Sequence, residues 1–212
     1  MKWDHLAEAI KQIEVVANRE NELVKVKQIP NQLECIGIGT DAAVFRPIEE
    51  PKLALKVFSP DKIEKVKIEQ QVYSYLGESL YFPTFYGNGT NYLVLSYEEG
   101  LTLYECLAQG IPIPQQAIKD VDEARKYAQN RGLNPRDIHL KNILLYKGRA
   151  KLLDVSEYLK QGNDYRWEYL KRGYEEYYDM IRGKPIPYWV MDMVRKRYNQ
   201  SSPTPFHCNH TH

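Results

Sequence analysis

The chain has 212 residues, of which 43% are apolar and 27% are charged, and its formal net charge is +1. This length is enough for one domain or for two small lobes around a cleft. The balanced charge argues against a nucleic-acid partner, and three cysteines far apart in sequence argue against a disulfide framework. We see no signal peptide and no apolar run of the roughly 20 residues that span a bilayer. We therefore expect a cytoplasmic protein.

Apolar residues at helical spacing over residues 3–17 predict an N-terminal helix, which we place within residues 1–22. Short strand-like runs follow between residues 23 and 58, separated by glycines and prolines. Ser59 as N-cap and Pro60 in the first turn predict the start of a helix that ends near Gly77. With two more strands expected near residues 82–97, residues 23–97 are predicted to form a sheet-rich lobe around one helix.

After a predicted hinge near residues 96–101, the spacing of apolar residues becomes helical. One helix is expected to end near Gly132, a pair of short strands to flank the Lys147-Gly148 turn, and another helix to run from about Trp167 to Ile181. Residues 98–200 are therefore predicted to form a mainly helical second lobe. Residues 201–212 are expected to be a disordered tail. The alternative for this tail is a metal site, whose candidate ligands are His207, Cys208, His210 and His212.

Two glycines and a lysine occupy neighbouring strand segments. Gly37 and Gly39 lie between two predicted strands, where the backbone N–H groups of a glycine turn can approach phosphate oxygens, although an ordinary β-turn explains the glycines alone. Lys56 alternates with apolar residues in the next strand, so it points toward the cleft. A buried lysine needs a counter-ion. Glu69 is the expected partner because it shares an apolar stripe of the following helix.

The strongest signal is a set of three polar residues. Asn142 follows Asp137 by five residues, and Asp154 comes after the predicted strand pair. Phosphoryl transfer from ATP uses one carboxylate to orient the acceptor hydroxyl, while an amide oxygen and a second carboxylate hold Mg²⁺ against the phosphates. This pattern therefore predicts an ATP- and magnesium-dependent phosphotransferase.

In their order along residues 33–157, these motifs resemble the eukaryotic-type protein-kinase superfamily, and most of all its short bacterial serine/threonine members. The resemblance implies an α+β, two-lobed protein-kinase-like fold with an antiparallel five-stranded N-lobe and a truncated helical C-lobe. It implies a protein substrate as well as ATP, and Leu95 as the residue before the adenine-binding hinge. The implied catalytic residues are Asp137, Lys56, Glu69 and His139, the implied nucleotide contacts are Gly37, Gly39, Val44, Ala54, Lys56, Ser96, Glu98 and Leu144, and the implied metal ligands are Asn142 and Asp154.

The chain departs from the family at several positions. Pro135 replaces a histidine, and Ser156 stands where the family has a mobile glycine. His139 replaces a lysine that neutralises the γ-phosphate, and Lys141 is a candidate to compensate. Arg136 is expected to form a structural ion pair. The segment after Asp154 is short and lacks an Ala-Pro-Glu motif, a reduction similar to that of RIO-type kinases.

Three functions are compatible with this sequence. The intact set of site residues favours an active serine/threonine-protein kinase. The departures leave a pseudokinase, which would act as a nucleotide-binding regulatory module, as an alternative. A small-molecule kinase is the third possibility, since such enzymes use a related Asp-x-x-x-x-Asn site, but they carry larger C-lobes.

Overall fold

This computed structural model describes residues 4–17 and 22–193. The predicted tail over residues 201–212, with its candidate ligands His207, Cys208, His210 and His212, lies outside the described residues, as does the end of the predicted C-lobe. No helix within the described ranges is long and apolar enough to cross a bilayer.

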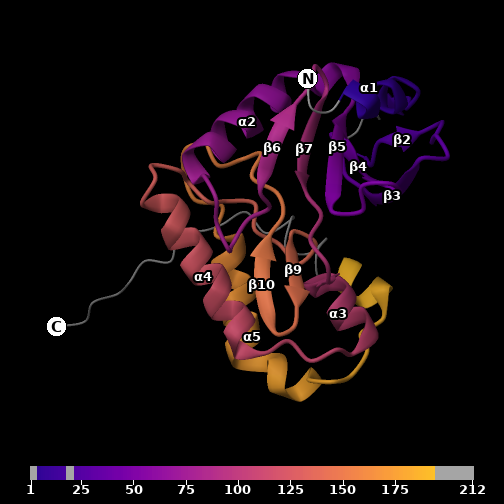
Figure 1. The fold of residues 1–212 in the computed structure, drawn as a ribbon. Helices are drawn as coiled ribbons and strands as arrows, with labels where there is room; N and C mark the ends of the chain where they lie inside the picture. Colours follow the sequence, from indigo (N-terminus) through magenta and orange to yellow (C-terminus); the bar gives the residue numbers. More distant parts are fainter. Residues whose placement is uncertain (1–3, 18–21, 194–212) are drawn as a thin grey trace.

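The first half of the chain is built around a five-stranded antiparallel sheet, as predicted (Figure 1). Its strands, in the spatial order β3-β4-β5-β7-β6, are β3 Leu33–Ile38, β4 Ala42–Pro47, β5 Leu53–Phe58, β6 Phe85–Asn88 and β7 Tyr92–Ser96. Successive side chains point to opposite faces. In β5, Leu55 and Val57 join the core under helix α1, whereas Ala54 and Phe58 join the core that continues into the second lobe. Lys56 therefore lies on the face that looks toward the second lobe.

The N-terminal helix is shorter than the sequence predicts. Helix α1 covers Asp4–Lys11, and the chain then forms β1 Val15–Val16, which pairs antiparallel with β2 Lys25–Val26. Branching at Cβ restricts the side chains of Val15 and Val16 in a helix and suits them to a strand, which explains why the apolar spacing does not continue as helix. The prediction of a helix over residues 3–17 is wrong beyond Lys11.

The helix of the first lobe begins with a 3₁₀ turn over Pro60–Lys62 and continues as α2 Glu64–Leu76, with Gly77 ending it at a φ of 61°. Ser59 occupies the N-cap position, as predicted, but its side chain makes no capping hydrogen bond. The Ser59 side chain is fully buried, and its hydroxyl donates to the carbonyl oxygen of Asp41, 3.2 Å away. Burial therefore directs the hydroxyl toward the β3–β4 turn instead of toward the helix.

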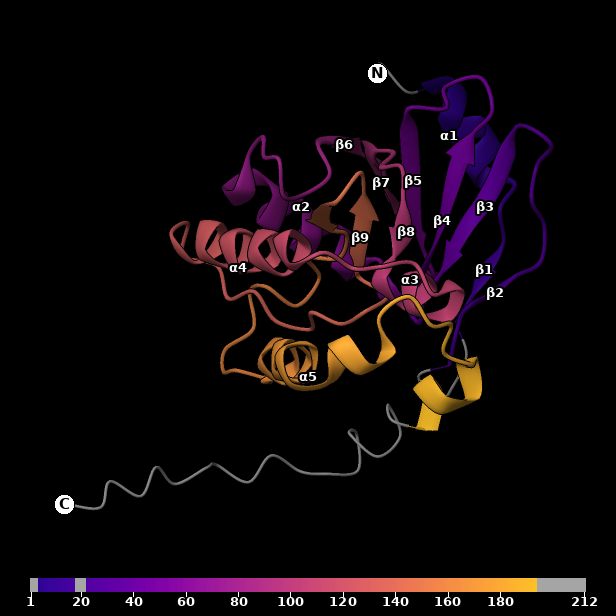
Figure 2. The same cartoon turned by 90° about the horizontal axis from the view of Figure 1, so that it is seen from below.

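The second half is mainly helical: α3, α4 and α5 lie below the large sheet in Figure 1, and Figure 2 shows α4 and α5 to one side of β3, β4 and β5. Its elements are β8 Leu101–Thr102, α3 Leu103–Gln109, α4 Gln115–Gln129, β9 Ile143–Tyr146, β10 Arg149–Leu152 and α5 Arg166–Ile181. The three short strands form a second sheet in the order β10-β9-β8. After α5, residues 188–193 are helical up to the end of the described chain. These halves make a two-lobed α+β fold with a reduced helical lobe.

The connection between the lobes requires glycine at one position. Gly100 has a φ of 135°, and a Cβ at this residue would lie 2.4 Å from the carbonyl oxygen of Leu145 in β9. A side chain would therefore both strain the backbone and collide with the second sheet. Thr102 then starts α3 through a capping box with Glu105. The hinge is thus packed directly against the β9–β10 hairpin.

Candidate active site

Lys56 joins the two lobes through two carboxylates. Its Nζ lies 2.6 Å from Oε1 of Glu69 on α2 and 3.3 Å from Oδ1 of Asp154, which follows β10. Glu69 is almost fully buried, as are the apolar residues of its stripe, Val66, Val72, Tyr73 and Leu76. The orientation of Lys56 follows from the alternation of side chains along β5, and that of Glu69 follows from the apolar stripe along α2.

The electrostatics of this group depend on the lysine. Burial opposes the charged form of Lys56, but Asp154 and Glu69 outweigh it, so the pKa of Lys56 is raised. Burial raises the pKa of Glu69 to about 7, against the opposing effect of Lys56. For Asp154, burial is outweighed by Lys56 and by hydrogen bonds from Ser156, so its pKa falls to about 2. Asp154 is therefore a carboxylate at neutral pH and Lys56 a cation.

Asp137 lies in a rigid loop with a left-handed backbone. Its φ is 58°, an uncommon value for a residue with a Cβ. Its N–H donates to Oδ2 of Asp164, 2.6 Å away, and its carbonyl oxygen accepts a hydrogen bond from Nδ2 of Asn142 at 3.2 Å. The backbone is thus fixed on both sides of the Asp137 side chain. Backbone strain held in this way by neighbouring groups is frequent at functional sites.

A cation from another element contacts Asp137. The NH1 group of Arg166, the first residue of α5, donates to Oδ1 of Asp137. Burial nevertheless raises the pKa of Asp137 to about 6, because Arg166 only partly offsets the burial and the nearby charges of Asp154 and Asp164.

Asn142 and Asp154 are suited to hold a divalent cation. The N–H of Leu153 donates to the carbonyl oxygen of Asn142 at 2.9 Å, which brings Asp154 next to the Asp137 loop. Because Asn142 Nδ2 is the atom that donates to Asp137, the amide oxygen is left as an acceptor. An amide oxygen and an ionised carboxylate are ligands that Mg²⁺ accepts, together with phosphate oxygens and water. The described residues contain no cluster of three or more His, Cys, Asp or Glu side chains that would hold a metal without such additional ligands.

The glycine turn between β3 and β4 is closed by its own hydrogen bond. The N–H of Gly39 donates to the carbonyl oxygen of Ala42, 2.8 Å away, so this N–H is not directed at a ligand here. Asp41 at the tip places a negative charge in the turn. Lys65 of α2 neutralises it, with Nζ 2.6 Å from Oδ2 of Asp41, and the same Nζ is 3.9 Å from Oε1 of Glu157. The turn, α2 and the segment after Asp154 are therefore tied together by charge.

The hinge leaves polar backbone groups available. The N–H of Ser96 donates to the carbonyl oxygen of Thr84, and the N–H of Tyr97 donates to that of Lys52. The Glu98 carboxylate is held by two other side chains. It accepts hydrogen bonds from Ser96 Oγ at 2.5 Å and from Lys151 Nζ at 2.7 Å. Among the described residues, no backbone hydrogen bond uses the N–H or the C=O of Glu98. These two groups are what an adenine edge would need.

The predicted apolar nucleotide contacts also lie near the cleft. Ala54 pairs with Leu95 across β5 and β7, and Val44 pairs with Lys56 across β4 and β5. Leu144, from β9 of the second lobe, is buried. The strands therefore place Ala54 and Val44 on the sheet face that carries Lys56, whereas Leu144 lines a cavity beside the hinge.

Three residues of the Asp137 loop have contacts of their own. The N–H of Lys141 donates to Nδ1 of His139 at 3.3 Å, and Lys141 Nζ lies 4.5 Å from the centre of the Tyr104 ring on α3. Lys141 is thus directed toward α3. Among the residues that the structure describes, Arg136 forms no ion pair, contrary to the prediction. Its NH1 donates to the carbonyl oxygen of Gln161, so it holds the short segment after Asp154 against the loop.

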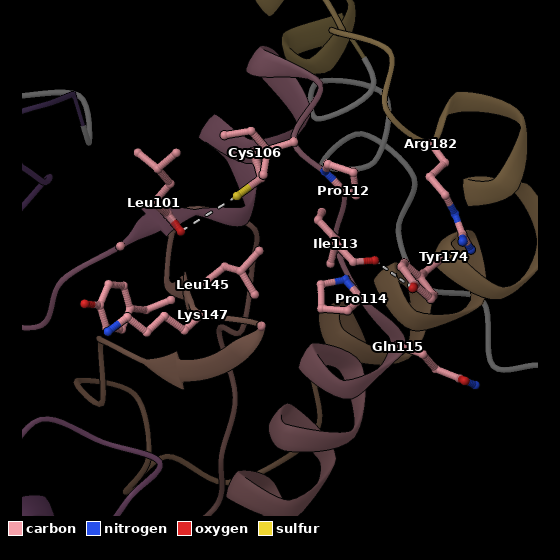
Figure 3. A pocket seen from close by; sticks show the side chains of 14 residues that line it. Leu101, Cys106, Pro112, Ile113, Pro114, Gln115, Leu145, Lys147, Tyr174 and Arg182 are labelled. Atoms are coloured by element: carbon pink, nitrogen blue, oxygen red, sulfur yellow. Dashed lines mark hydrogen bonds between the residues drawn. The ribbon is translucent and has the colours of Figure 1, made fainter.

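Two cavities lie apart from this group of residues. One of about 760 Å³ opens in the second lobe between α3, the loop before α4, the β9–β10 turn and α5 (Figure 3). The other, of about 590 Å³, lies on the outer side of the hinge. The first is lined by Leu101, Cys106, Ile113, Leu145 and Tyr174 among others, and the second by Tyr97, Glu98, Leu144 and Lys151 among others. Neither is lined by Lys56, Asp137, Asn142 or Asp154.

The sequence reasoning missed two residues of this site, Asp164 and Arg166. The available signal was an aspartate just before the tyrosine-rich helix, since Asp164 Oδ1 accepts a hydrogen bond from the N–H of Arg166 in its first turn. Nothing local to either residue indicates that both contact the Asp137 loop.

A five-stranded antiparallel lobe, a reduced helical lobe, and a lysine, three carboxylates and an asparagine gathered between them define a protein-kinase-like protein. The chain is 34% identical over 189 residues to a protein of Bacillus subtilis (strain 168) named "Putative serine/threonine-protein kinase YrzF", with 88% of each chain covered. The chain therefore belongs to the eukaryotic-type protein-kinase family. A crystal structure of the Rad53 kinase domain and SCD2 matches 59% of this chain and 50% of that chain at 18% identity, with a TM-score of 0.47. No family model matches the sequence.

Proposed function

We propose that this protein is an ATP-dependent serine/threonine-protein kinase that uses Mg²⁺. The observation that carries the proposal is the contact of Lys56 with both Glu69 and Asp154, from two different lobes, beside the fixed Asp137 loop. The relative from Bacillus subtilis supports the same class of activity.

In this proposal ATP lies between the lobes, with its adenine edge at the backbone of Glu98 and its α- and β-phosphates at Lys56. Lys56 is suited to this role because its neighbours keep it charged and Glu69 holds its position. Asn142 and Asp154 would hold Mg²⁺, which supplies positive charge to the phosphates when bound.

Asp137 would orient the hydroxyl of a serine or threonine and accept its proton. The hydroxyl oxygen forms a bond to the γ-phosphorus as the bond from that phosphorus to the β,γ-bridging oxygen breaks, and ADP leaves. A carboxylate whose pKa is about 6 is mostly ionised at neutral pH and is a better proton acceptor than an ordinary aspartate.

The experiment is a transfer assay with purified protein, γ-labelled ATP and Mg²⁺, with and without a generic basic acceptor protein. We expect label on protein with the wild type, and a loss of roughly 100-fold or more for Asp137→Asn and Asp154→Asn. Asp179→Asn is the matched control, because Asp179 is an exposed aspartate of α5. If the wild type bound ATP but transferred no label, a nucleotide-binding module would replace the kinase.

The small-molecule alternative is tested in the same assay. Label that appears on a low-molecular-weight acceptor such as an aminoglycoside or choline, and on no protein, would favour it. The short segment between Asp154 and α5 supports neither acceptor class over the other.

A further inference from the structure

Arg166 is placed where it does not help its own helix. As the first residue of α5, it puts a positive charge at the positive end of the helix dipole, a position that favours acidic residues. The helix start is held instead by Asp164, whose Oδ1 accepts the N–H of Arg166 at 3.2 Å. The position of this guanidinium therefore needs an explanation outside α5.

The surroundings of Asp137 are rich in negative charge. The carboxylates of Asp154, Asp164 and Glu157 all act on Asp137. Lys56 is already bound to Glu69 and Asp154, and Lys65 to Asp41. A triphosphate that enters this site needs a further cation near its last phosphate.

Two other basic residues of the loop are poorly placed for this task. His139 Nδ1 accepts a hydrogen bond from the N–H of Lys141 at 3.3 Å, so this ring nitrogen faces the backbone of its own loop. The amine of Lys141 lies over the ring of Tyr104. Neither of these two contacts involves the Asp137 carboxylate.

Arg166 retains hydrogen-bond donors toward the site. A guanidinium has five N–H groups in a planar fork, and within the described part of the chain the hydrogen bonds of this one use NH1 alone, with Asp137. Its side chain is 38% exposed, and Nε is 4.0 Å from Oδ2 of Asp164. We propose that the Arg166 guanidinium bridges the Asp137 carboxylate and the γ-phosphate of ATP, so that α5 supplies the cation for the transferring phosphoryl group. This rests on the proposed function for the location of ATP.

The first test compares the affinities for ATP and ADP in the presence of Mg²⁺ by equilibrium binding, which requires no turnover. Arg166→Gln should weaken ATP binding by roughly tenfold or more relative to ADP binding. The matched control is Arg172→Gln on the same helix, since Arg172 pairs with Glu176 away from the site. An unchanged ratio of ATP to ADP affinity in Arg166→Gln would overturn the proposal.

A second comparison separates direct contact from simple neutralisation of Asp137. In the double variant Arg166→Gln/Asp137→Asn the unpaired carboxylate is gone, so only a missing contact to the γ-phosphate can still lower the preference for ATP. If the double variant prefers ATP over ADP less than Asp137→Asn alone does, the bridge is supported. If the two variants have the same preference for ATP, the bridge is contradicted.

Turnover gives an independent readout. Arg166→Gln should lower kcat by about 100-fold or more with a smaller change in the KM for ATP, and an unchanged or higher kcat would contradict the proposal.

If Arg166→Gln fails to fold, Arg166→Lys serves in its place, because a single amine cannot span carboxylate and phosphate as a planar fork does. Arg166→Lys should still lose part of the ATP preference, and a wild-type ratio would overturn the bridge. Absence of transfer by the wild type would refute the kinase activity while leaving the binding test intact.

Discussion

At the scale of single residues, the site depends on one buried cation between two carboxylates. Glu69 is 1% exposed and Lys56 is 12% exposed, so the charges of this pair are largely removed from water. Removing one member of a buried pair leaves the other uncompensated, whereas replacing both by apolar groups is often neutral. The ion pair therefore fixes the position of Lys56 and adds little to the stability of the fold.

This leads to a prediction for stability. Lys56→Met should destabilise the protein by about 3 kcal/mol, and the double variant Lys56→Met/Glu69→Met should recover most of that loss. Urea unfolding of both variants checks it. A double variant as unstable as Lys56→Met would show that packing, not the uncompensated Glu69 carboxylate, causes the loss.

The pH dependence of Lys56→Met has a definite sign. Burial already raises the folded-state pKa of Glu69 from its ordinary 4.5 to about 7, and loss of Lys56 raises it further. A raised folded-state pKa contributes stability that is present in acid and is lost as the pH rises. The deficit of Lys56→Met should therefore be nearly constant below pH 7 and grow as the pH rises from about 7 to about 9, when unfolding is measured at each pH. A deficit independent of pH would contradict the assignment of the buried charge to Glu69.

The sequence predicts part of this site and misses another part, for a physical reason. The directions of Lys56 and Glu69 follow from strand alternation and a helical stripe, which are local periodicities. The contact between Arg166 and Asp137 joins residues 29 apart and depends on where α5 begins. No periodicity encodes that start, because the segment before it is irregular and is fixed by the long-range hydrogen bonds of Asp164 and Arg136.

At the scale of elements, one buried aspartate connects α4 to the hairpin that precedes the site. Asp120 is 1% exposed, and its two oxygens accept hydrogen bonds of 2.8 Å from the side chains of Arg149 and Gln116 and from the N–H of Ala150 in β10. Asp154 follows two residues after β10 ends at Leu152. Asp120 thus fixes the strand from which the proposed metal ligand emerges.

We predict that Asp120→Asn destabilises the protein by roughly 2–3 kcal/mol, because an amide cannot accept all of these bonds and turns a donor toward buried donors. Thermal or urea unfolding measures this loss. The exposed Asp179→Asn should change stability by less than about 0.5 kcal/mol. A loss no larger than in that control would mean that α4 and β10 stay joined by apolar packing alone.

Acid should erase the difference between wild type and Asp120→Asn. Burial opposes ionisation of Asp120, but the hydrogen bonds from Arg149, Gln116 and Ala150 outweigh it and hold the pKa below its ordinary 3.8. A lowered folded-state pKa contributes stability that is complete above 3.8 and is lost as the pH falls through the folded-state value. The gap between the two unfolding curves should therefore close in that acidic range.

Element boundaries were harder to predict than element types. The five strands and α2 were predicted because each carries a clear alternation or stripe bounded by glycine or proline. Helix α1 was predicted too long, since Val15 and Val16 continue the apolar spacing although they pair with β2. This pairing joins two separate segments of the chain, which the spacing of apolar residues within one segment does not report.

At the scale of the whole molecule, three charge contacts cross between the lobes or reach the hinge. Lys56 contacts Asp154, Lys65 lies near Glu157, and Lys151 of β10 contacts Glu98 in the hinge. One apolar core also continues from the first lobe into the second. The relative position of the lobes therefore depends on this core and on charged groups that a bound nucleotide and its metal would also contact. The lobes and the ligand should therefore be energetically coupled.

The last prediction follows from this coupling. A ligand present at 100 times its dissociation constant stabilises the state that binds it by about 2.7 kcal/mol. For a chain of this size, ATP with Mg²⁺ should then raise Tm by about 5–10 °C in one cooperative transition, because both lobes contact the same ligand.

In Asp154→Asn, the part of the shift that Mg²⁺ adds to ATP alone should disappear, whereas Asp179→Asn should retain it. Differential scanning calorimetry with ATP in excess Mg²⁺ or in EDTA measures these shifts. A Mg²⁺-dependent shift of wild-type size in Asp154→Asn would remove Asp154 from the metal site, and a split transition in which only one component moves would show that the ligand is held by a single lobe.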